Sequence, residues 1–98
     1  LGLVKTLALE GAEAGIAVSA VCPGYVRTPL VESQIAAQAE AHGITEERVV
    51  EDVLLAPQAV KELLEPEDVA EAVAFLLGPV GRFATGSPLV VDGGWLAR

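Results

Sequence analysis

The chain has 98 residues, a hydrophobic fraction of 52% and a formal net charge of -8. Its apolar content excludes a disordered chain, and its length allows at most one domain. The acidic balance argues against nucleic acid and anionic membrane surfaces as partners, because neither attracts an acidic protein. A phosphate-bearing ligand stays open, since backbone N–H groups and helix ends bind phosphate whatever the net charge.

The single cysteine, Cys22, excludes a disulfide framework and a cysteine-based zinc site, and it is compatible with a reducing cytoplasm. No apolar run approaches the roughly 20 residues of a membrane span, and no basic-then-apolar signal pattern opens the chain. We therefore expect a cytoplasmic protein with no metal site. Because the first residue is Leu1 and not Met, we also expect the sequence to be a piece of a longer protein.

The first half of the chain predicts a helix, a strand and two further helices. Apolar residues at helical spacing favour a helix over 1–14, and the almost continuously apolar run 16–22 is typical of a strand covered on both faces of a parallel sheet. Thr28-Pro29 resembles an N-cap with proline in the first turn, which opens a helix ending at Gly43. Thr45 can cap a short helix after it.

The second half predicts a loop with a helical turn, one more helix and a last strand. The loop covers about 56–64, the helix 66–77 begins with an acidic first turn, and the strand spans 88–92. This alternation is that of a doubly wound α/β sheet. Two strands are too few to satisfy each other's backbone groups, so we expect residues outside this sequence to complete the sheet.

The loop that follows the first strand is the candidate ligand site, because open α/β sheets bind ligands at the carboxyl ends of their strands. Gly24 would let the backbone approach a ligand, Val26 could offer its backbone N–H and C=O to a planar amide, and Thr28 offers a hydroxyl. The alternative is a plain Pro-Gly turn, with Thr28 acting only as a helix cap.

Other polar residues have simpler explanations. His42 lies near a predicted helix end, where a surface or capping role is expected, and Cys22 is a small apolar filler on a strand. The acidic pairs 46–47 and 67–68 each open a helix and compensate its dipole. The run 92–94 lacks the spacing of a phosphate loop, so we interpret it as a turn that folds the C-terminus back.

Several blocks in fixed order resemble the C-terminal part of a short-chain dehydrogenase/reductase, and together they cover nearly the whole chain. The blocks are Leu7-Ala8-Leu9-Glu10, Gly15-Ile16-Ala17-Val18, Cys22-Pro23-Gly24-Tyr25-Val26-Arg27-Thr28-Pro29, Pro66-Glu67-Asp68-Val69-Ala70, Phe75-Leu76, Thr85-Gly86 and Val90-Val91-Asp92-Gly93-Gly94. The resemblance implies the C-terminal portion of a single Rossmann-like domain, with a substrate lid at about 29–64. The catalytic Ser, Tyr and Lys and the glycine-rich cofactor loop would lie outside this chain.

The same resemblance implies that Pro23, Gly24, Val26 and Thr28 line the nicotinamide pocket of an NAD site. Val26 would bind the carboxamide through its backbone, and Thr28 would bind the amide or the pyrophosphate. Tyr25 is not the catalytic tyrosine, because no Lys stands four residues after it. It would form part of the substrate pocket wall, or be an exposed loop aromatic.

A narrower resemblance is to the branch of this family that oxidises 3-hydroxybutyrate. It rests on residues 28–35, 52–58, 61–62 and 92–98. It implies that Gln34 binds the substrate carboxylate and that Trp95 closes the pocket. The alternatives are a solvent-facing residue for Gln34, and a packing or subunit-contact residue for Trp95. Many members of the branch have tryptophan where this chain has Tyr25, so the pocket shape would differ.

The sequence thus predicts part of an NAD-dependent oxidoreductase that transfers a hydride between nicotinamide and the secondary alcohol of a small hydroxy acid, 3-hydroxybutyrate. We expect this segment alone to be inactive, and the whole protein to form a homotetramer through the helices 1–14 and 66–77 and the last strand. Two alternatives remain. One is another reductase of the family, for 3-oxoacyl carriers or sugars, and the other is a non-enzymatic subunit-contact module.

Overall fold

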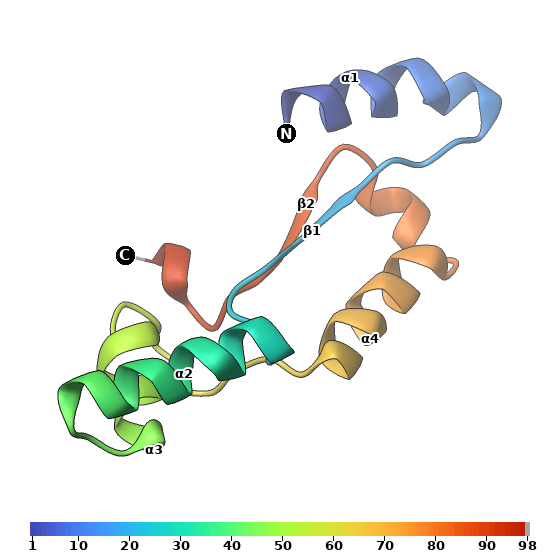
Figure 1. The fold of residues 1–98 in the computed structure, drawn as a ribbon. Coiled ribbons are helices and arrows are strands. Elements are labelled where there is room, and N and C mark those ends of the chain that lie inside the picture. Colours follow the sequence, from blue (N-terminus) through green and yellow to red (C-terminus); the bar gives the residue numbers. More distant parts are fainter. Residues whose placement is uncertain (98) are drawn as a thin grey trace. The chain divides into compact units, whose positions relative to one another are not determined.

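The structure is a computed structural model that describes residues 1–97 and divides them into two compact units. Unit 1 comprises Leu1–Cys22 and Glu67–Val91, and unit 2 comprises Pro23–Pro66 and the residues from Asp92 onward. Figure 1 shows the course of the chain through both. In the part that the structure describes, no helix is long and apolar enough to cross a membrane.

Unit 1 contains the strands and the two helices that accompany them. Its elements are α1 (Gly2–Gly11), a 3-10 turn (Ala12–Ala14), β1 (Ala20–Pro23), α4 (Pro66–Leu77), a second 3-10 turn (Gly81–Ala84) and β2 (Pro88–Val91). β1 and β2 pair as a two-stranded parallel sheet, and α1 and α4 lie on opposite sides of it (Figure 1). This is the layered arrangement that the sequence predicts, so the α/β fold class is confirmed.

The predicted strand 16–22 begins later than expected, at Ala20. Before Ala20 the chain is hydrogen-bonded to the turn at residues 85–86. Gly86 N–H donates to the Val18 carbonyl at 2.8 Å, and Val18 N–H donates to the Thr85 hydroxyl at 3.0 Å. Because the neighbouring segment is a turn at this level, no strand ladder forms beside residues 16–19. The last strand likewise ends at Val91 and not at residue 92.

Few side chains of unit 1 are buried. Ala8 is the only buried hydrophobic residue among its described residues, and both strands are at most half-buried. Within the described residues each strand has one neighbouring strand and the sheet has only two helices beside it, so its faces are only partly covered. Cover on both faces stays a prediction for a sheet that residues outside this sequence complete. Large apolar side chains stay exposed on the helices: Leu3, Leu7 and Leu9 on α1, and Val73, Phe75 and Leu77 on α4.

Unit 2 has a hydrophobic core of its own. It contains α2 (Pro29–His42), α3 (Glu46–Arg48), a π-helical segment (Val49–Leu54) and a C-terminal 3-10 turn (Trp95–Ala97). The buried side chains that form its core come from α2, the π-helical segment and the loop after it: Ile35, Val49, Leu54, Leu55 and Leu63. These contacts make residues 23–66 a folded segment and not an open loop.

The ends of α2 follow the capping signals in the sequence. The Thr28 hydroxyl accepts a hydrogen bond from Val31 N–H at 3.2 Å, and Pro29 opens the helix. Gly43 ends it with φ 63°, a conformation in which a side chain is strained. Thr45 caps α3 in the same way as Thr28 caps α2, by accepting from Arg48 N–H.

The sequence does not predict the π-helical segment. Leu55 N–H donates to the Val50 carbonyl five residues earlier, and Val49 and Leu54 both become buried. The Lys61 ammonium donates to the carbonyls of Leu55 and Ala56 at 2.6 and 2.8 Å, and so satisfies groups at the end of this segment.

Candidate functional site

The loop after β1 pairs with the end of the predicted lid. Leu64 N–H donates to the Tyr25 carbonyl at 2.9 Å, and Arg27 N–H donates to the Leu64 carbonyl at 2.7 Å. These two bonds form a parallel bridge between Val26 and Leu64. In such a bridge the bonds go to the neighbours of the central residue, so its own N–H and C=O face the opposite side.

Val26 therefore presents a donor and an acceptor next to each other on one side of the loop. Within residues 1–97, no backbone hydrogen bond of this loop ends on either group. A primary amide carries the complementary pair, an NH₂ donor and a C=O acceptor. The arrangement can hold a planar carboxamide at two points.

Thr28 follows two residues later, at the N-terminus of α2. Its oxygen accepts the capping bond from Val31, which is the structural role that the sequence offers as the alternative. The hydroxyl hydrogen is not used by that bond and can still donate to a ligand oxygen. The side chain is half-buried, and the free N–H groups of the helix end add to its attraction for anions.

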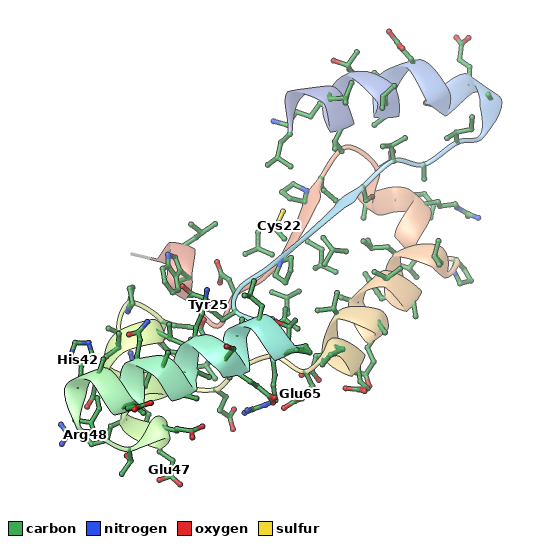
Figure 2. The ribbon with its side chains drawn as sticks, in the orientation of Figure 1. Cys22, Tyr25, His42, Glu47, Arg48 and Glu65 are labelled. Carbon is green, nitrogen blue, oxygen red and sulfur yellow. The ribbon has the colours of Figure 1, made fainter. Side chains whose placement is uncertain are left out.

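The two candidate pocket aromatics come together. The rings of Tyr25 and Trp95 lie with centroids 5.9 Å apart and planes tilted by 59°. Such tilted pairs are favourable because the edge of one ring meets the face of the other. Tyr25, labelled in Figure 2, also packs against the core of unit 2, so it is not a freely exposed loop aromatic.

Trp95 is held by the turn that precedes it. The Asp92 carboxylate accepts hydrogen bonds from Gly94 N–H at 3.0 Å and from Leu96 N–H at 3.1 Å. Gly93 and Gly94 have φ values of 62° and 89°, which other residues adopt only with strain. The turn predicted at 92–94 is thus confirmed, and Asp92 has a positioning role that an Asp-Gly-Gly run could have signalled.

Two candidate site residues are exposed. Gln34 lies on the exposed side of α2, next to the buried Ile35, and among the described residues its amide makes no hydrogen bond. Pro23 is exposed at the end of β1. The structure therefore brings Tyr25 and Trp95 together beside the loop of Val26 and Thr28, and it leaves Gln34 open to solvent.

Gln58 is a buried polar residue that the sequence reasoning missed. Its side chain is 3% exposed, and its Nε2 donates to the carbonyls of Val60 and Glu62 at 2.6 and 3.0 Å. Its Oε1 is buried and, within residues 1–97, accepts no hydrogen bond. Lying in a stretch that the sequence marks only as a loop, it gave no periodic signal.

Gly24 and Gly93 both adjoin that amide. A Cβ at Gly24 would lie 3.2 Å from Gln58 Oε1 and 3.1 Å from Asp92 Cα, and a Cβ at Gly93 would lie 2.6 Å from Gln58 Nε2. Gly24 thus allows the close approach of two protein loops, in addition to any approach by a ligand.

Charged side chains surround the loop at the surface. Arg27 Nε lies 3.0 Å from Glu65 Oε1, and its Nη1 lies 3.8 Å from Glu32 Oε1, with all three side chains largely exposed. Figure 2 labels Glu65 and, at the other end of α2, His42, Glu47 and Arg48. Across residues 1–97, no group of three or more His, Cys, Asp or Glu side chains could hold a metal ion.

A parallel strand pair between helices, followed by a loop with open backbone groups, is the arrangement of a Rossmann-like α/β subunit. Residues 1–96 match a family model described as enoyl-(acyl carrier protein) reductase. The chain belongs to this family, which is one of the short-chain dehydrogenases/reductases.

Two curated relatives match over all of this chain. The D-beta-hydroxybutyrate dehydrogenase of Rhizobium meliloti is 48% identical over 98 residues, and the enzyme of the same name from Cupriavidus necator is 35% identical. In both cases the match covers 100% of this chain and 38% of the relative. The chain thus spans well under half the length of these relatives.

Solved structures agree on the fold. A short chain dehydrogenase family protein from Francisella tularensis superposes with a TM-score of 0.84 and 33% identity, over 99% of this chain and 40% of that one. A 4-hydroxyisoleucine dehydrogenase complexed with NADH gives 0.79 and 30%, over 99% and 36%. A variant of actinorhodin polyketide ketoreductase with NADPH gives 0.76 and 36%, over 96% and 36%.

Proposed function

We propose that this chain is the C-terminal portion of an NAD-dependent dehydrogenase that interconverts 3-hydroxybutyrate and acetoacetate. The observation that carries the proposal is the open N–H and C=O pair of Val26 on the loop beside the Tyr25–Trp95 pair. The 48% identity to a D-beta-hydroxybutyrate dehydrogenase supports the choice of substrate.

The residues of the loop fit a nicotinamide. The Val26 N–H would donate to the carboxamide oxygen and its C=O would accept from the carboxamide nitrogen, while the free hydrogen of the Thr28 hydroxyl would donate to the amide or to a pyrophosphate oxygen. Pro23 and Gly24 would line the same pocket. When bound, the nicotinamide supplies the hydride acceptor and donor of the reaction. Similar structures hold NADH or NADPH, which supports a nicotinamide cofactor.

The substrate site is proposed over the aromatic pair. Gln34 would donate its amide hydrogens to the substrate carboxylate from the exposed side of α2, and a neutral donor there holds the anion without burying a second charge. The apolar faces of Tyr25 and Trp95 would contact the methyl group and exclude water. The base that takes the hydroxyl proton would come from a part of the enzyme outside this chain.

We also propose that the enzyme is a cytoplasmic homotetramer, with α1, α4 and β2 at its subunit contacts. What supports the contacts is that α1, α4 and β2 expose large apolar side chains, since exposed apolar patches mark interaction sites.

The substrate assignment is tested by replacing Gln34 in the full-length enzyme. The Gln34→Leu variant removes the proposed donor and keeps a side chain of similar size, so we expect the KM for 3-hydroxybutyrate to rise about tenfold, the value of one charge-assisted hydrogen bond. The KM for NAD should stay unchanged. Gln38→Leu, one turn further along α2, is the matched control and should leave both constants as they are. An unchanged KM for 3-hydroxybutyrate in Gln34→Leu would remove the carboxylate-binding role.

A further inference from the structure

Gln58 connects three segments of unit 2 that the proposed site depends on. Its amide donates to two carbonyls of the returning end of the lid, Val60 and Glu62, and bends residues 58–62 into a tight loop. That loop is attached to the turn before Trp95 by Val60 N–H, which donates to the Gly93 carbonyl at 2.8 Å. Two residues beyond it, Leu64 pairs with the loop that carries Tyr25.

The amide is also enclosed by the two glycine-containing loops themselves. A Cβ on Gly24 would lie 3.2 Å from its oxygen, and a Cβ on Gly93 would lie 2.9 Å or less from its Cγ, Cδ and Nε2. The group therefore fills the space between the segment that carries Tyr25 and the segment that carries Trp95. Burying a polar group costs free energy unless it is hydrogen-bonded, and among the described residues the amide nitrogen is bonded twice whereas the oxygen accepts no hydrogen bond.

We propose that Gln58 is a positioning residue of the substrate pocket, whose buried amide fixes the end of the lid against the Tyr25 loop and the Trp95 turn. This rests on the proposed function, because the pocket is the one assigned above. Gln58 acts through Tyr25 and Trp95 and is not placed in contact with substrate. Losing its donor hydrogens would leave the carbonyls of Val60 and Glu62 without their partner and let the two aromatic rings separate.

The test uses three variants of the full-length enzyme. Gln58→Leu removes both donor hydrogens at similar volume, and we expect the KM for 3-hydroxybutyrate to rise about tenfold while kcat changes by less than about threefold. Amide hydrogen exchange of residues 24–26, 58–64 and 92–96 should become faster. Gln38→Leu makes the same chemical change at a glutamine of α2 whose side chain has no hydrogen bond among the described residues. This control should change neither the KM for 3-hydroxybutyrate nor the hydrogen exchange rates.

Gln58→Glu adds a second measurement, the pH dependence of the KM, which a merely structural residue would not change. When ionised, the introduced carboxylate faces two carbonyl oxygens and cannot donate, whereas the protonated form restores one hydrogen bond. Burial raises the pKa of the introduced carboxyl group, Asp92 from the neighbouring turn adds to that rise, and Lys61 from the same segment opposes it. We expect the KM of this variant, relative to that of the wild type, to fall as the pH is lowered.

The outcomes separate this inference from the proposed function. If the wild-type enzyme does not oxidise 3-hydroxybutyrate, the proposed function fails, and hydrogen exchange in Gln58→Leu still decides whether the residue positions the two loops. If the wild-type enzyme is active and Gln58→Leu keeps its KM and its exchange rates, the inference is overturned. If Gln58→Leu does not fold, a pH-independent KM ratio in Gln58→Glu would overturn it.

Discussion

A comparison of two glycine substitutions tests the packing of the Trp95 turn. Gly93 and Gly43 have nearly the same left-handed backbone, with φ of 62° and 63°. They differ in their surroundings, because a Cβ at Gly93 would lie 2.6 Å from Gln58 Nε2, whereas one at Gly43 meets nothing within 4 Å. Gly43→Ala therefore isolates the backbone cost, and Gly93→Ala adds the displacement of Gln58.

The expected magnitudes follow from these contacts. An alanine in the left-handed conformation costs about 1 kcal/mol, and this is all that Gly43→Ala should lose. Gly93→Ala should lose about 2 kcal/mol more, because the displaced amide gives up its two hydrogen bonds to the carbonyls of Val60 and Glu62, at about 1 kcal/mol each. Urea unfolding of the full-length variants at one fixed protein concentration measures both values. Equal losses of unfolding free energy in the two variants would refute the reasoning, since they would show that displacing the Gln58 side chain does not destabilise the protein.

Three further predictions concern the loop and the chain as a whole. Thr28→Ala and Thr45→Ala should each lower the free energy of unfolding by about 1 kcal/mol through loss of a helix cap. Only Thr28→Ala should also weaken NADH binding, by about fivefold in fluorescence titration. Equal NADH affinities in the two variants would leave Thr28 as a helix cap alone. Arg27→Gln should lower the free energy of unfolding, measured in urea, by less than about 1 kcal/mol, because its ion pairs are exposed. A larger loss would contradict the surface role of these pairs. The isolated 98-residue chain should form no NADH from NAD and 3-hydroxybutyrate, and measurable activity would contradict the placement of the base outside it.

Features encoded by neighbouring residues could be predicted from the sequence. The helix start at Thr28-Pro29, its end at Gly43 and the cap at Thr45 each depend on side chains and backbone angles within one turn. The turn before Trp95 is of the same kind, since Asp92 binds the backbone two and four residues on. The α/β class followed from the order of these elements.

Features that depend on distant residues could not be predicted. Where β1 begins is decided by the turn at 84–86, which no local pattern near residue 16 records. The outward direction of the Val26 backbone groups follows from pairing with Leu64. Gln58 owes its burial to Gly24 and Gly93, which approach it from two other parts of the sequence. Single-sequence patterns contain none of these distances.

The most direct test of the central claim is the reaction of the full-length protein with NAD and 3-hydroxybutyrate, followed by the absorbance of NADH. The proposal predicts NADH formation with 3-hydroxybutyrate, no comparable rate with NADP, and a fall in kcat/KM of about tenfold in Gln34→Leu. A protein that leaves 3-hydroxybutyrate unchanged and instead oxidises NADPH with a 3-oxoacyl thioester would contradict it, and would assign the Val26 loop and the Tyr25–Trp95 pair to a different reductase of the family.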